Sequence, residues 1–298
     1  MNKKIIVTGA TGFVGSNLVK FLLNKEFEIA VIVREDSNLS NLEGIINDIE
    51  IFCYDNNLKN LISFFKKTKS EFIFHLASNF IAEHEFKQVD SLIESNITFG
   101  LHLLEAMKES GVKKLINTGT SWQHFNNEEY NPVCLYAATK QAFESLIEYY
   151  VQAEGFSVIT LKLFDTYGEN DKRPKLINLL NKFADEDTEL NMSAGEQILN
   201  LVHISDVCDA YYNAYRLIST NDNNEHDIYS VIHDDSYSLK DVIRLFEKVT
   251  AKSIKVNWGR RPYRKREVMS LWDNGNILPN WKAKISLNEG LSRYKNSP

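Results

Sequence analysis

Cysteine, proline and long apolar runs are all scarce in this chain of 298 residues. Its three cysteines, Cys53, Cys134 and Cys208, lie far apart and form no CxxC pair. We therefore expect no disulfide framework, no metal site and a reducing compartment. The apolar run before Gly9 is too short for the core of a signal peptide, and no later run is long enough to span a membrane. These absences predict a cytoplasmic protein without a membrane partner.

Positive charge is not in excess either. The chain has 34 lysines and arginines against 40 aspartates and glutamates, for a formal net charge of -6. Nucleic-acid binding depends largely on neutralising phosphates, so we expect no nucleic-acid partner. Hydrophobic residues make up 43% of the chain and charged residues 25%, a composition typical of a globular protein with a sizeable core.

Apolar, β-rich segments alternate with helical patterns through the first half of the chain. The expected strands are Lys4–Thr8, Ile29–Arg34, Glu50–Tyr54, Phe72–Leu76, Lys114–Thr118 and Ser157–Leu163. The expected helices are Gly15–Asn24, Leu58–Thr68, Ser91–Ser110 and Tyr136–Glu154. Strands that are apolar throughout and separated by helices indicate an α/β fold, a doubly wound parallel sheet with helices on both faces.

Patterns in the second half are weaker. They suggest a short strand at 200–204, a helix at 206–218 and a strand near 227–232. With only five prolines, the chain shows no Gly/Ser-rich linker. We predict a larger domain over residues 1–167, completed by return segments at about 200–233, and a smaller C-terminal α/β domain formed mainly by residues 168–298.

A glycine-rich turn, Thr8-Gly-Ala-Thr-Gly-Phe-Val-Gly15, connects the first strand to the first helix. Gly9 permits the tight turn, Gly12 lets a pyrophosphate approach the backbone, and Gly15 lets helix and strand pack closely. The helix N-terminus then offers N–H groups to the phosphates. This arrangement predicts a dinucleotide-binding domain of the Rossmann type. The cofactor-binding residues expected in the turn are Gly9, Thr11, Gly12, Phe13, Val14 and Gly15.

The second expected strand ends at Arg34. An acidic residue there would accept a hydrogen bond from a free ribose 2′-hydroxyl, whereas an arginine pairs with a 2′-phosphate. Arg34 therefore favours NADP, used in its reduced form NADPH. Glu35, one residue further on, keeps NAD as the alternative.

Tyr136 and Lys140 begin a helix and share one face at positions i and i+4. The pKa of a tyrosine is ordinarily near 10, and a nearby cation lowers it, so that the phenol can act as an acid near neutral pH. The fifth strand continues into Gly119-Thr120-Ser121, at the sheet edge where doubly wound folds bind ligands. We expect Thr120 to hydrogen-bond a substrate oxygen beside Tyr136.

These motifs occur in order with others. They are TGATGFVG, His75-Leu-Ala-Ser78, Asn96, the hydroxyl-bearing fifth strand, Tyr136-Ala-Ala-Thr-Lys140 and Leu163-Phe-Asp-Thr-Tyr-Gly168, with Gly195-Glu-Gln and Val202-His-Ile-Ser-Asp-Val207 later. Over nearly its whole length the chain thus resembles the extended short-chain dehydrogenase/reductase family of NAD(P)-dependent sugar epimerases, dehydratases and reductases. Its C-terminal half resembles the nucleotide-sugar 4-ketoreductases of deoxyhexose synthesis for bacterial surface polysaccharides.

The resemblance implies a role for each matching residue. Tyr136 is the acid/base, Lys140 holds the nicotinamide ribose and lowers the tyrosine pKa, and Thr120 takes the Ser/Thr role. The further cofactor contacts that it implies are Asp55, Asn56, Leu76, Ala77, Asn96, Thr118 and Phe164. The implied substrate contacts are Thr120, Ser121, Asp165, Lys175, Arg261 and Arg266, the last two from the densest basic run of the chain.

The resemblance also reduces the number of reaction types that fit this chain. Dehydratases of the family carry an acid and a glutamate where this chain has Ser121 and Trp122, and the epimerase-reductases use a cysteine at the position of Ser121. Net reductases consume NADPH, which suits Arg34, so we expect reduction of a nucleotide-linked 4-keto-6-deoxy sugar. Two alternatives stay open: a nucleotide-sugar 4-epimerase with retained NAD, and a non-enzymatic dinucleotide-binding regulator.

The chain departs from the family at three positions. Leu199 and Lys162 stand where arginine is usual, and Asp165 stands where asparagine is usual. The change at 199 removes a usual anchor of the substrate nucleotide.

The helices at 91–110 and 136–154 carry apolar residues on more than one stripe. We therefore expect a homodimer in which two subunits pack these helices into a four-helix interface, as in the resembled family. The residues expected there are Leu92, Leu103, Phe143, Ile147 and Tyr150.

Overall fold

The computed structural model describes residues 3–220 and 223–295. Its centre is a seven-stranded sheet with the strand order β11-β6-β5-β4-β1-β2-β3, in which every neighbouring pair is parallel. The strands are β1 (Lys4–Thr8), β2 (Glu28–Arg34), β3 (Ile49–Tyr54), β4 (Phe72–His75), β5 (Lys114–Thr120), β6 (Ser157–Leu163) and β11 (His226–Val231). The doubly wound parallel sheet predicted from the sequence is confirmed, and the strand ends differ from the predicted ones by at most two residues.

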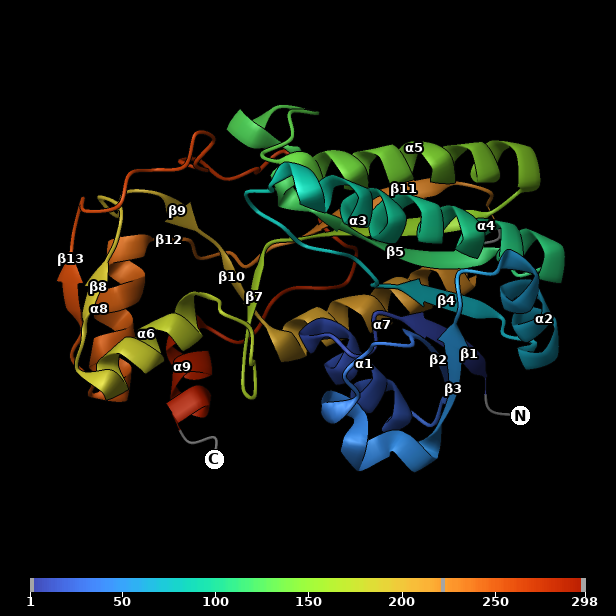
Figure 1. Ribbon diagram of the computed structural model, residues 1–298, viewed down its shortest axis with the longest axis horizontal. Coiled ribbons are helices and arrows are strands. Elements are labelled where there is room, and N and C mark those ends of the chain that lie inside the picture. Colours follow the sequence, from blue (N-terminus) through green and yellow to red (C-terminus); the bar gives the residue numbers. More distant parts are fainter. Residues whose placement is uncertain (1–2, 221–222, 296–298) are drawn as a thin grey trace.

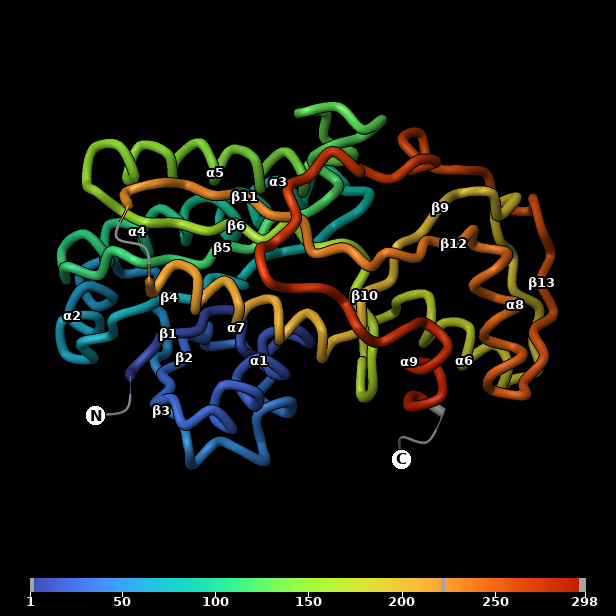
Figure 2. Tube along the Cα trace, turned by 180° about the vertical axis from the view of Figure 1, so that it is seen from behind, coloured from blue at the N-terminus to red at the C-terminus, as the bar shows by residue number. Residues whose placement is uncertain are grey.

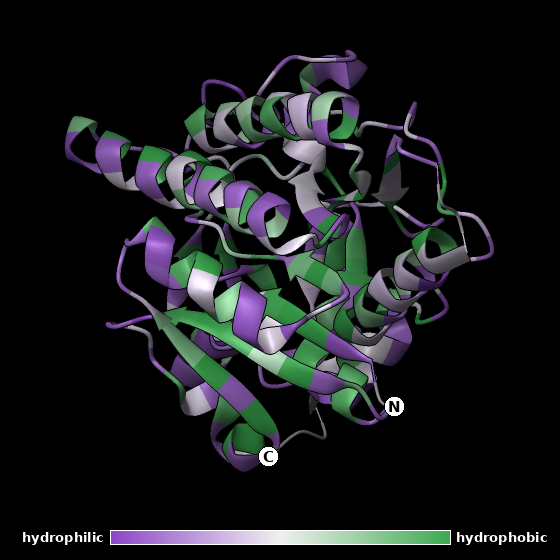
Figure 3. Cartoon of the chain, turned by 90° about the vertical axis from the view of Figure 1, so that its right-hand side faces the viewer, coloured by the Kyte–Doolittle hydropathy of each residue, from purple (hydrophilic) through white to green (hydrophobic). Residues whose placement is uncertain are grey.

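Helices cover both faces of this sheet (Figure 1). On one face α1 (Phe13–Leu23) and α7 (Ile204–Thr220) bury their apolar sides. On the other face α2 (Leu58–Thr68), α4 (Phe99–Ser110) and α5 (Leu135–Glu154) do the same. A short helix α3 (Val89–Ile93) and one π-helical turn (Glu94–Thr98) lead into α4. Figure 3 shows the largely hydrophobic strands between helices that alternate hydrophilic and hydrophobic residues.

The apolar residues expected at a subunit interface face the interior of the chain instead. Each of them is at most 3% exposed, and all but Leu92 belong to the core cluster under α2, α4 and α5. The prediction that these five residues form a subunit interface is therefore wrong. Both helices use a wide apolar face within one subunit, because each packs on the sheet and on the neighbouring helix at once. The larger apolar side chains that stay exposed on this side are Ile93 and Tyr149.

A smaller group of elements lies beyond the carboxyl edge of the sheet. Three two-stranded pairs belong to it: β7 (Asp165–Tyr167) with β10 (Leu201–His203), β8 (Glu189–Asn191) with β13 (Lys255–Asn257), and β9 (Ile198–Leu199) with β12 (Tyr237–Ser238). The helices α6 (Leu176–Glu186), α8 (Leu239–Thr250) and α9 (Leu287–Lys295) accompany them. Much of this group shares a buried cluster separate from the two that flank the sheet.

The chain between β13 and α9 returns to the large sheet before it enters α9 (Figure 2). Trp272 joins the sheet's core there, and the carbonyl oxygen of Asn276 accepts a hydrogen bond of 2.8 Å from the Ser230 N–H. This return brings a basic segment next to the carboxyl ends of β5 and β6. Within the part of the chain that the structure describes, no helix combines the length and the apolar character needed to cross a membrane.

Candidate active site

The carboxyl ends of β1, β4, β5 and β6 meet at one edge, because the sheet is parallel and its strand order reverses between β1 and β4. A cleft of about 260 Å³ lies at this edge. It brings together many residues singled out in the sequence: Gly9, Gly12, Phe13, Val14, Gly15, Leu76, Thr118, Thr120, Ser121, Tyr136, Phe164, Asp165 and Lys175.

The glycine turn forms one wall of the cleft and is shaped by the absence of side chains. Gly9 has a positive φ of 69°, and a Cβ there would lie 2.6 Å from the Ala77 nitrogen. A Cβ on Gly15 would lie 2.1 Å from the Gly9 oxygen. Thr8 Oγ1 accepts hydrogen bonds from the Leu76 and Ala77 N–H groups (3.2 and 3.1 Å), which ties β4 to the turn. Gly12 caps α1 without a side-chain hydrogen bond, so the helix N-terminus suits a pyrophosphate.

Tyr136 and Lys140 come from the first turns of α5 and are both buried, with 8% and 1% of their surfaces exposed. Burial raises the pKa of Tyr136 to about 12 and outweighs a hydrogen bond with Ser78 that lowers it. Burial also lowers the pKa of Lys140 to about 8, against the attraction of Glu144, which raises it. The lowered tyrosine pKa expected from the sequence is therefore not found. The phenol keeps its proton at neutral pH, as a general acid must.

Thr120 ends β5 and caps a short 3-10 turn formed by residues 121–123. Its backbone N–H donates to Gln123 Oε1 (3.0 Å), and its hydroxyl oxygen accepts from the Trp122 N–H (3.3 Å). Thr118 is held by other contacts, since its hydroxyl donates to the His75 carbonyl (2.8 Å) and lies 2.7 Å from the Tyr211 hydroxyl. Both threonines thus have fixed positions on the floor of the cleft.

Asn96 is buried and does not line the cleft. Its Oδ1 accepts from the Asn79 N–H (2.7 Å), and its Nδ2 donates to the Asn79 carbonyl (3.0 Å) and to the Thr139 hydroxyl (2.9 Å). The side chain therefore holds the loop after β4 against α5. The contact of Asn96 with the cofactor stays a prediction.

Several other predicted cofactor residues lie outside the cleft. The Thr11 carbonyl accepts a hydrogen bond from Asn41 (2.9 Å). Arg34, at the end of β2, is exposed, and its Nε lies 3.4 Å from Asp36 Oδ1. Asp55 and Asn56 follow the neighbouring strand β3, where Asp55 accepts a hydrogen bond of 2.7 Å from Asn60. These residues flank the glycine turn on the side of β2 and β3.

The basic run after β13 contributes a different arginine from those named in the sequence analysis. Arg261 is exposed, and the Arg266 guanidinium lies 4.3 Å from the centre of the Phe125 ring and bonds Asn131. Neither lines the cleft or the cavities beside it. Arg264 lines both of these cavities. Its guanidinium lies 5.0 Å from the centre of the Trp122 ring and forms an ion pair of 2.6 Å with Glu267.

A larger cavity of about 510 Å³ opens beside the cleft and is lined by Arg173, Lys175, Arg264 and Asp165. Arg173, which the sequence analysis missed, lies over the Phe13 ring at 4.4 Å and donates to the Thr166 carbonyl (2.9 Å). Burial raises the pKa of Asp165, although the three cations act to lower it. The three basic residues at 172–175 that follow Tyr167-Gly168 are the sequence signal that could have pointed to this cavity.

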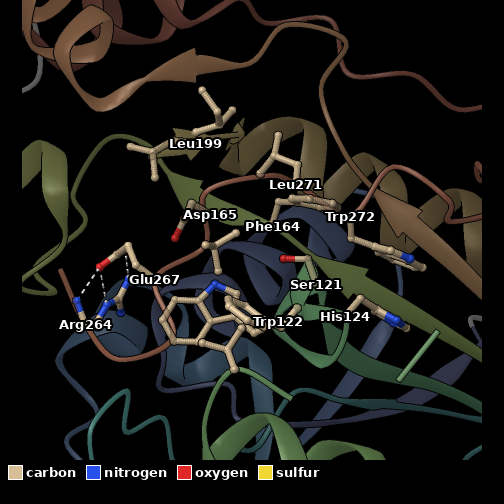
Figure 4. Close-up of a pocket in the computed structure, with 14 residues that line it drawn as sticks. Ser121, Trp122, His124, Phe164, Asp165, Leu199, Arg264, Glu267, Leu271 and Trp272 are labelled. Atoms are coloured by element: carbon tan, nitrogen blue, oxygen red, sulfur yellow. Dashed lines mark hydrogen bonds and ion pairs between the residues drawn. The ribbon is translucent and has the colours of Figure 1, made fainter. Parts of the chain in front are cut away.

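A third, small cavity of about 40 Å³ lies on the other side of Ser121. Figure 4 shows Phe164, Leu199, Leu271 and Trp272 around it, with the Ser121 hydroxyl and the Asp165 carboxyl group directed toward its centre. His124 stacks on Trp272 with ring centres 3.9 Å apart. Burial, assisted by Lys162, lowers the pKa of His124 to about 4, so this ring is neutral at physiological pH.

No group of three or more histidine, cysteine, aspartate or glutamate side chains within 3–220 and 223–295 is arranged to hold a metal ion. The glycine turn, the helix N-terminus and the buried Tyr136–Lys140 pair fit a nicotinamide dinucleotide. These features define a Rossmann-type dinucleotide-binding protein. The chain belongs to the NAD dependent epimerase/dehydratase family, whose model matches residues 5–231.

Curated relatives and solved structures resemble the chain over almost its full length. It is 27% identical over 302 residues to the CDP-abequose synthase of Salmonella muenchen, covering 98% of this chain and 97% of the relative. It is 25% identical to the CDP-abequose synthase of Yersinia pseudotuberculosis, covering 90% and 91%. UDP-glucuronic acid 4-epimerase from Bacillus cereus, solved with UDP-glucuronic acid and NAD, has a TM-score of 0.84 at 22% identity and covers 98% of each chain. That structural likeness supports the fold.

The buried charge on Lys140 predicts a pH-dependent cost in stability. Its folded pKa of about 8 lies below the ordinary value of 10.5, so the unfolded chain binds more protons between these two values. The cost is thus present in full below about pH 8 and disappears as the pH rises to 10.5. Lys140→Met should raise the melting temperature at pH 7 by roughly 2–6 °C, and by less at pH 10.5. Thermal melts at both pH values check this, with the exposed Lys182→Met as control. A melting temperature of Lys140→Met that is unchanged or lower at pH 7, or raised equally at both pH values, would contradict this prediction.

Proposed function

We propose that the protein reduces a nucleotide-linked 4-keto-6-deoxy sugar to the 6-deoxy sugar with NADPH. The observation that carries the proposal is the shape of the site. Tyr136 and Thr120 line the same cleft as the glycine turn, and this cleft adjoins a large cavity with three basic residues on one side and a small cavity on the other. The relatives named CDP-abequose synthase support a nucleotide sugar as the substrate.

Each catalytic residue has a role that matches its surroundings. The reduced dinucleotide supplies the hydride when it is bound. Tyr136, which burial keeps protonated, donates its proton to the oxygen at carbon 4 of the sugar. Thr120 hydrogen-bonds that oxygen from the end of β5. Lys140 stays charged beneath the site, holds the nicotinamide ribose and stabilises the phenolate that proton transfer leaves.

The cationic cavity suits the diphosphate of a nucleotide sugar. Leu199 leaves that cavity without the arginine usual in the family, yet Arg173, Lys175 and Arg264 line it from other segments. Arg173 is paired with Asp171 at 2.7 Å, and Asp165 lies in the same lining. Guanidinium groups bind phosphate oxygens in bidentate fashion. Burial lowers the pKa of Lys175, and desolvated cations of this kind gain most from a dianionic ligand. We therefore assign the diphosphate to this cavity.

The small cavity beside Ser121 is placed to receive a substituent of the sugar and has a mixed lining. Its volume of about 40 Å³, against the roughly 10–15 Å³ that one water molecule needs, leaves room for a group of a few non-hydrogen atoms. Phe164, Leu271 and Trp272 offer apolar surface, and the His124 ring stacked on Trp272 is uncharged. Ser121, Asp165, Arg264 and Glu267 also line the cavity, so it offers polar partners to a 6-hydroxyl group as well as apolar surface to the methyl group of a 6-deoxy sugar.

A nucleotide-sugar 4-epimerase is the second candidate, because the same Tyr136, Lys140 and Thr120 would serve it and solved 4-epimerases share the fold. Its distinguishing property is retained NAD, since no net reduction occurs. Purified protein that carries stoichiometric NAD favours the epimerase, and protein that binds added NADPH reversibly favours the reductase.

Removing the phenol should separate chemistry from binding. Tyr136→Phe keeps the ring's packing but deletes the acid, so kcat with the best substrate should fall by roughly 10²–10⁴. Cofactor affinity should barely change, whereas Lys140→Met should weaken both. Steady-state kinetics and dinucleotide titrations measure the two effects. Tyr149→Phe is the matched control, because Tyr149 lies on the same helix and is 57% exposed. Full activity in Tyr136→Phe would rule out this site.

Arg34 should set the choice of cofactor. Its exposed guanidinium can pair with a ribose 2′-phosphate, so we expect NADPH to bind more tightly than NADH. Arg34→Asp should erode this preference by introducing repulsion. Titrations with both dinucleotides measure the ratio, with the exposed Arg244→Asp of α8 as control. Equal affinities in the unmodified protein would count against NADP.

We also infer a homodimer formed through the outer faces of α3, α4 and α5. Ile93 is 39% exposed and Tyr149 is 57% exposed there, while the inner faces of these helices pack within the subunit. Two aromatic or aliphatic anchors on a helical surface suit an isologous interface. Light scattering at micromolar concentration should give the mass of two chains, and Tyr149→Asp should reduce it. A monomer in the unmodified protein would refute the dimer.

A further inference from the structure

A buried cluster of charged and polar side chains lies behind Thr120 and Lys140, outside the reacting cleft. It consists of Glu144 on α5, Lys162 on β6, and Gln123 and His124 in the turn after β5. Lys162 Nζ lies 3.3 Å from Glu144 Oε2, and both side chains are 3% exposed. A buried ion pair adds little to stability, because desolvation offsets its attraction. Stability alone therefore does not account for this cluster.

A hydrogen bond holds one oxygen of the Glu144 carboxylate, and the Lys162 ion pair holds the other. Gln123 Nε2 donates to Glu144 Oε1 (2.9 Å), and Gln123 Oε1 accepts from the Thr120 N–H (3.0 Å). On the other side Lys162 Nζ donates to His124 Nε2 (2.8 Å), and His124 Nδ1 donates to the Glu128 carbonyl (3.0 Å). The carboxylate is thereby connected to the turn that carries Thr120 and cannot reorient freely.

The same carboxylate lies on the Lys140 face of α5. Tyr136, Lys140 and Glu144 follow one another at intervals of four residues and are all buried, so they share one face of the helix. Two titratable groups face Lys140 from α5, Tyr136 and Glu144, and His75 faces it from β4. Burial, with a smaller effect of Lys140, lowers the pKa of His75 to about 3, and Tyr136 keeps its proton. Of the three groups, Glu144 is the one that carries a negative charge.

The groups around Glu144 itself are cationic or neutral. Lys162 faces it from β6, and His226 faces it from β11. Burial lowers the pKa of His226, so that ring is neutral above pH 6.5. Lys162 is thus the cation that compensates the carboxylate, while Lys140 lies one helical turn away from it.

We propose that Glu144 is a positioning residue that keeps the Lys140 ammonium charged over the pH range in which the dinucleotide is bound, with Lys162 and Gln123 holding its carboxylate in place. The inference rests on the proposed function in one respect, namely that Lys140 holds the cofactor ribose. It requires no sugar substrate. Burial already lowers the pKa of Lys140, and the carboxylate opposes that fall. Without the negative charge, Lys140 would lose its proton at lower pH.

The test is the affinity for NADPH, measured by fluorescence titration between pH 6.5 and pH 10. In the unmodified protein we expect the affinity to fall above about pH 8, where Lys140 loses its proton. In Glu144→Gln the midpoint of this fall should move down by about one pH unit, with affinity at pH 6.5 retained. The glutamine keeps an oxygen that can accept the Gln123 hydrogen bond. Glu148→Gln makes the same exchange one turn further on, at an exposed position, and should leave the midpoint unchanged.

A double variant separates the electrostatic role from a structural one. Glu144→Gln leaves Lys162 buried without its partner and can lower the melting temperature. Glu144→Gln combined with Lys162→Met removes both charges, so stability should recover while the midpoint stays low. A midpoint that returns to its original value together with stability would show a merely structural pair and overturn the proposal. So would an unshifted midpoint in Glu144→Gln, or an unmodified protein whose affinity does not vary with pH. Failure of the proposed function would give another result. No 4-keto sugar would be reduced, while the midpoint of the fall in NADPH affinity would still shift in Glu144→Gln.

Discussion

All seven strands of the central sheet run in one direction, and the carboxyl ends of β1, β4, β5 and β6 therefore lie along a single edge. The glycine turn, the loop through Ser78, the Thr120 turn and Asp165 each follow one of these ends. The cleft depends on this alignment, since no two of these segments are close in the sequence. It depends equally on two glycines: a side chain on Gly15 would collide with the Gly9 backbone, and one on Gly9 would collide with the backbone of Leu76 and Ala77. The parallel register thus brings the site together, and the glycines leave room for a dinucleotide.

Burial at this edge favours the neutral form of both Tyr136 and Lys140, which suits the proposed role of the first and opposes that of the second. For the proposed reaction Tyr136 must keep its proton until the substrate oxygen accepts it, and burial favours this by raising the tyrosine pKa. Lys140 must remain charged, and burial opposes this. The carboxylate of Glu144, held by Lys162 and Gln123, offsets part of that cost. Ionisable groups kept in an unfavourable state are common at functional sites, where stability is given up for chemistry. In this protein the buried ionisable groups extend from Tyr136 and Lys140 one helical turn further, to Glu144.

The sequence predicts the sheet and the glycine turn well, because their signals are local. Apolar runs of strand length and a turn that tolerates a positive φ at Gly9 need no knowledge of distant residues. Local sequence patterns could not show which arginine of residues 261–267 lines the cavities beside the cleft. That segment has no regular period, and the contact with Trp122 and the pairing with Glu267 decide that Arg264 lines the cavity. The prediction of a lowered pKa for Tyr136 was wrong for a related reason. The extent of burial depends on the tertiary structure, and burial raises this pKa.

Net reduction at carbon 4 of the sugar is tested most directly with NADPH deuterated at carbon 4 of the nicotinamide. The protein is incubated with this NADPH and a panel of nucleotide-linked 4-keto-6-deoxy sugars, and the products are examined by NMR. We expect one sugar to acquire deuterium at its carbon 4, with an equal amount of NADPH consumed. Interconversion of two 4-epimers by protein that carries NAD, without deuterium uptake or NADPH consumption, would contradict net reduction.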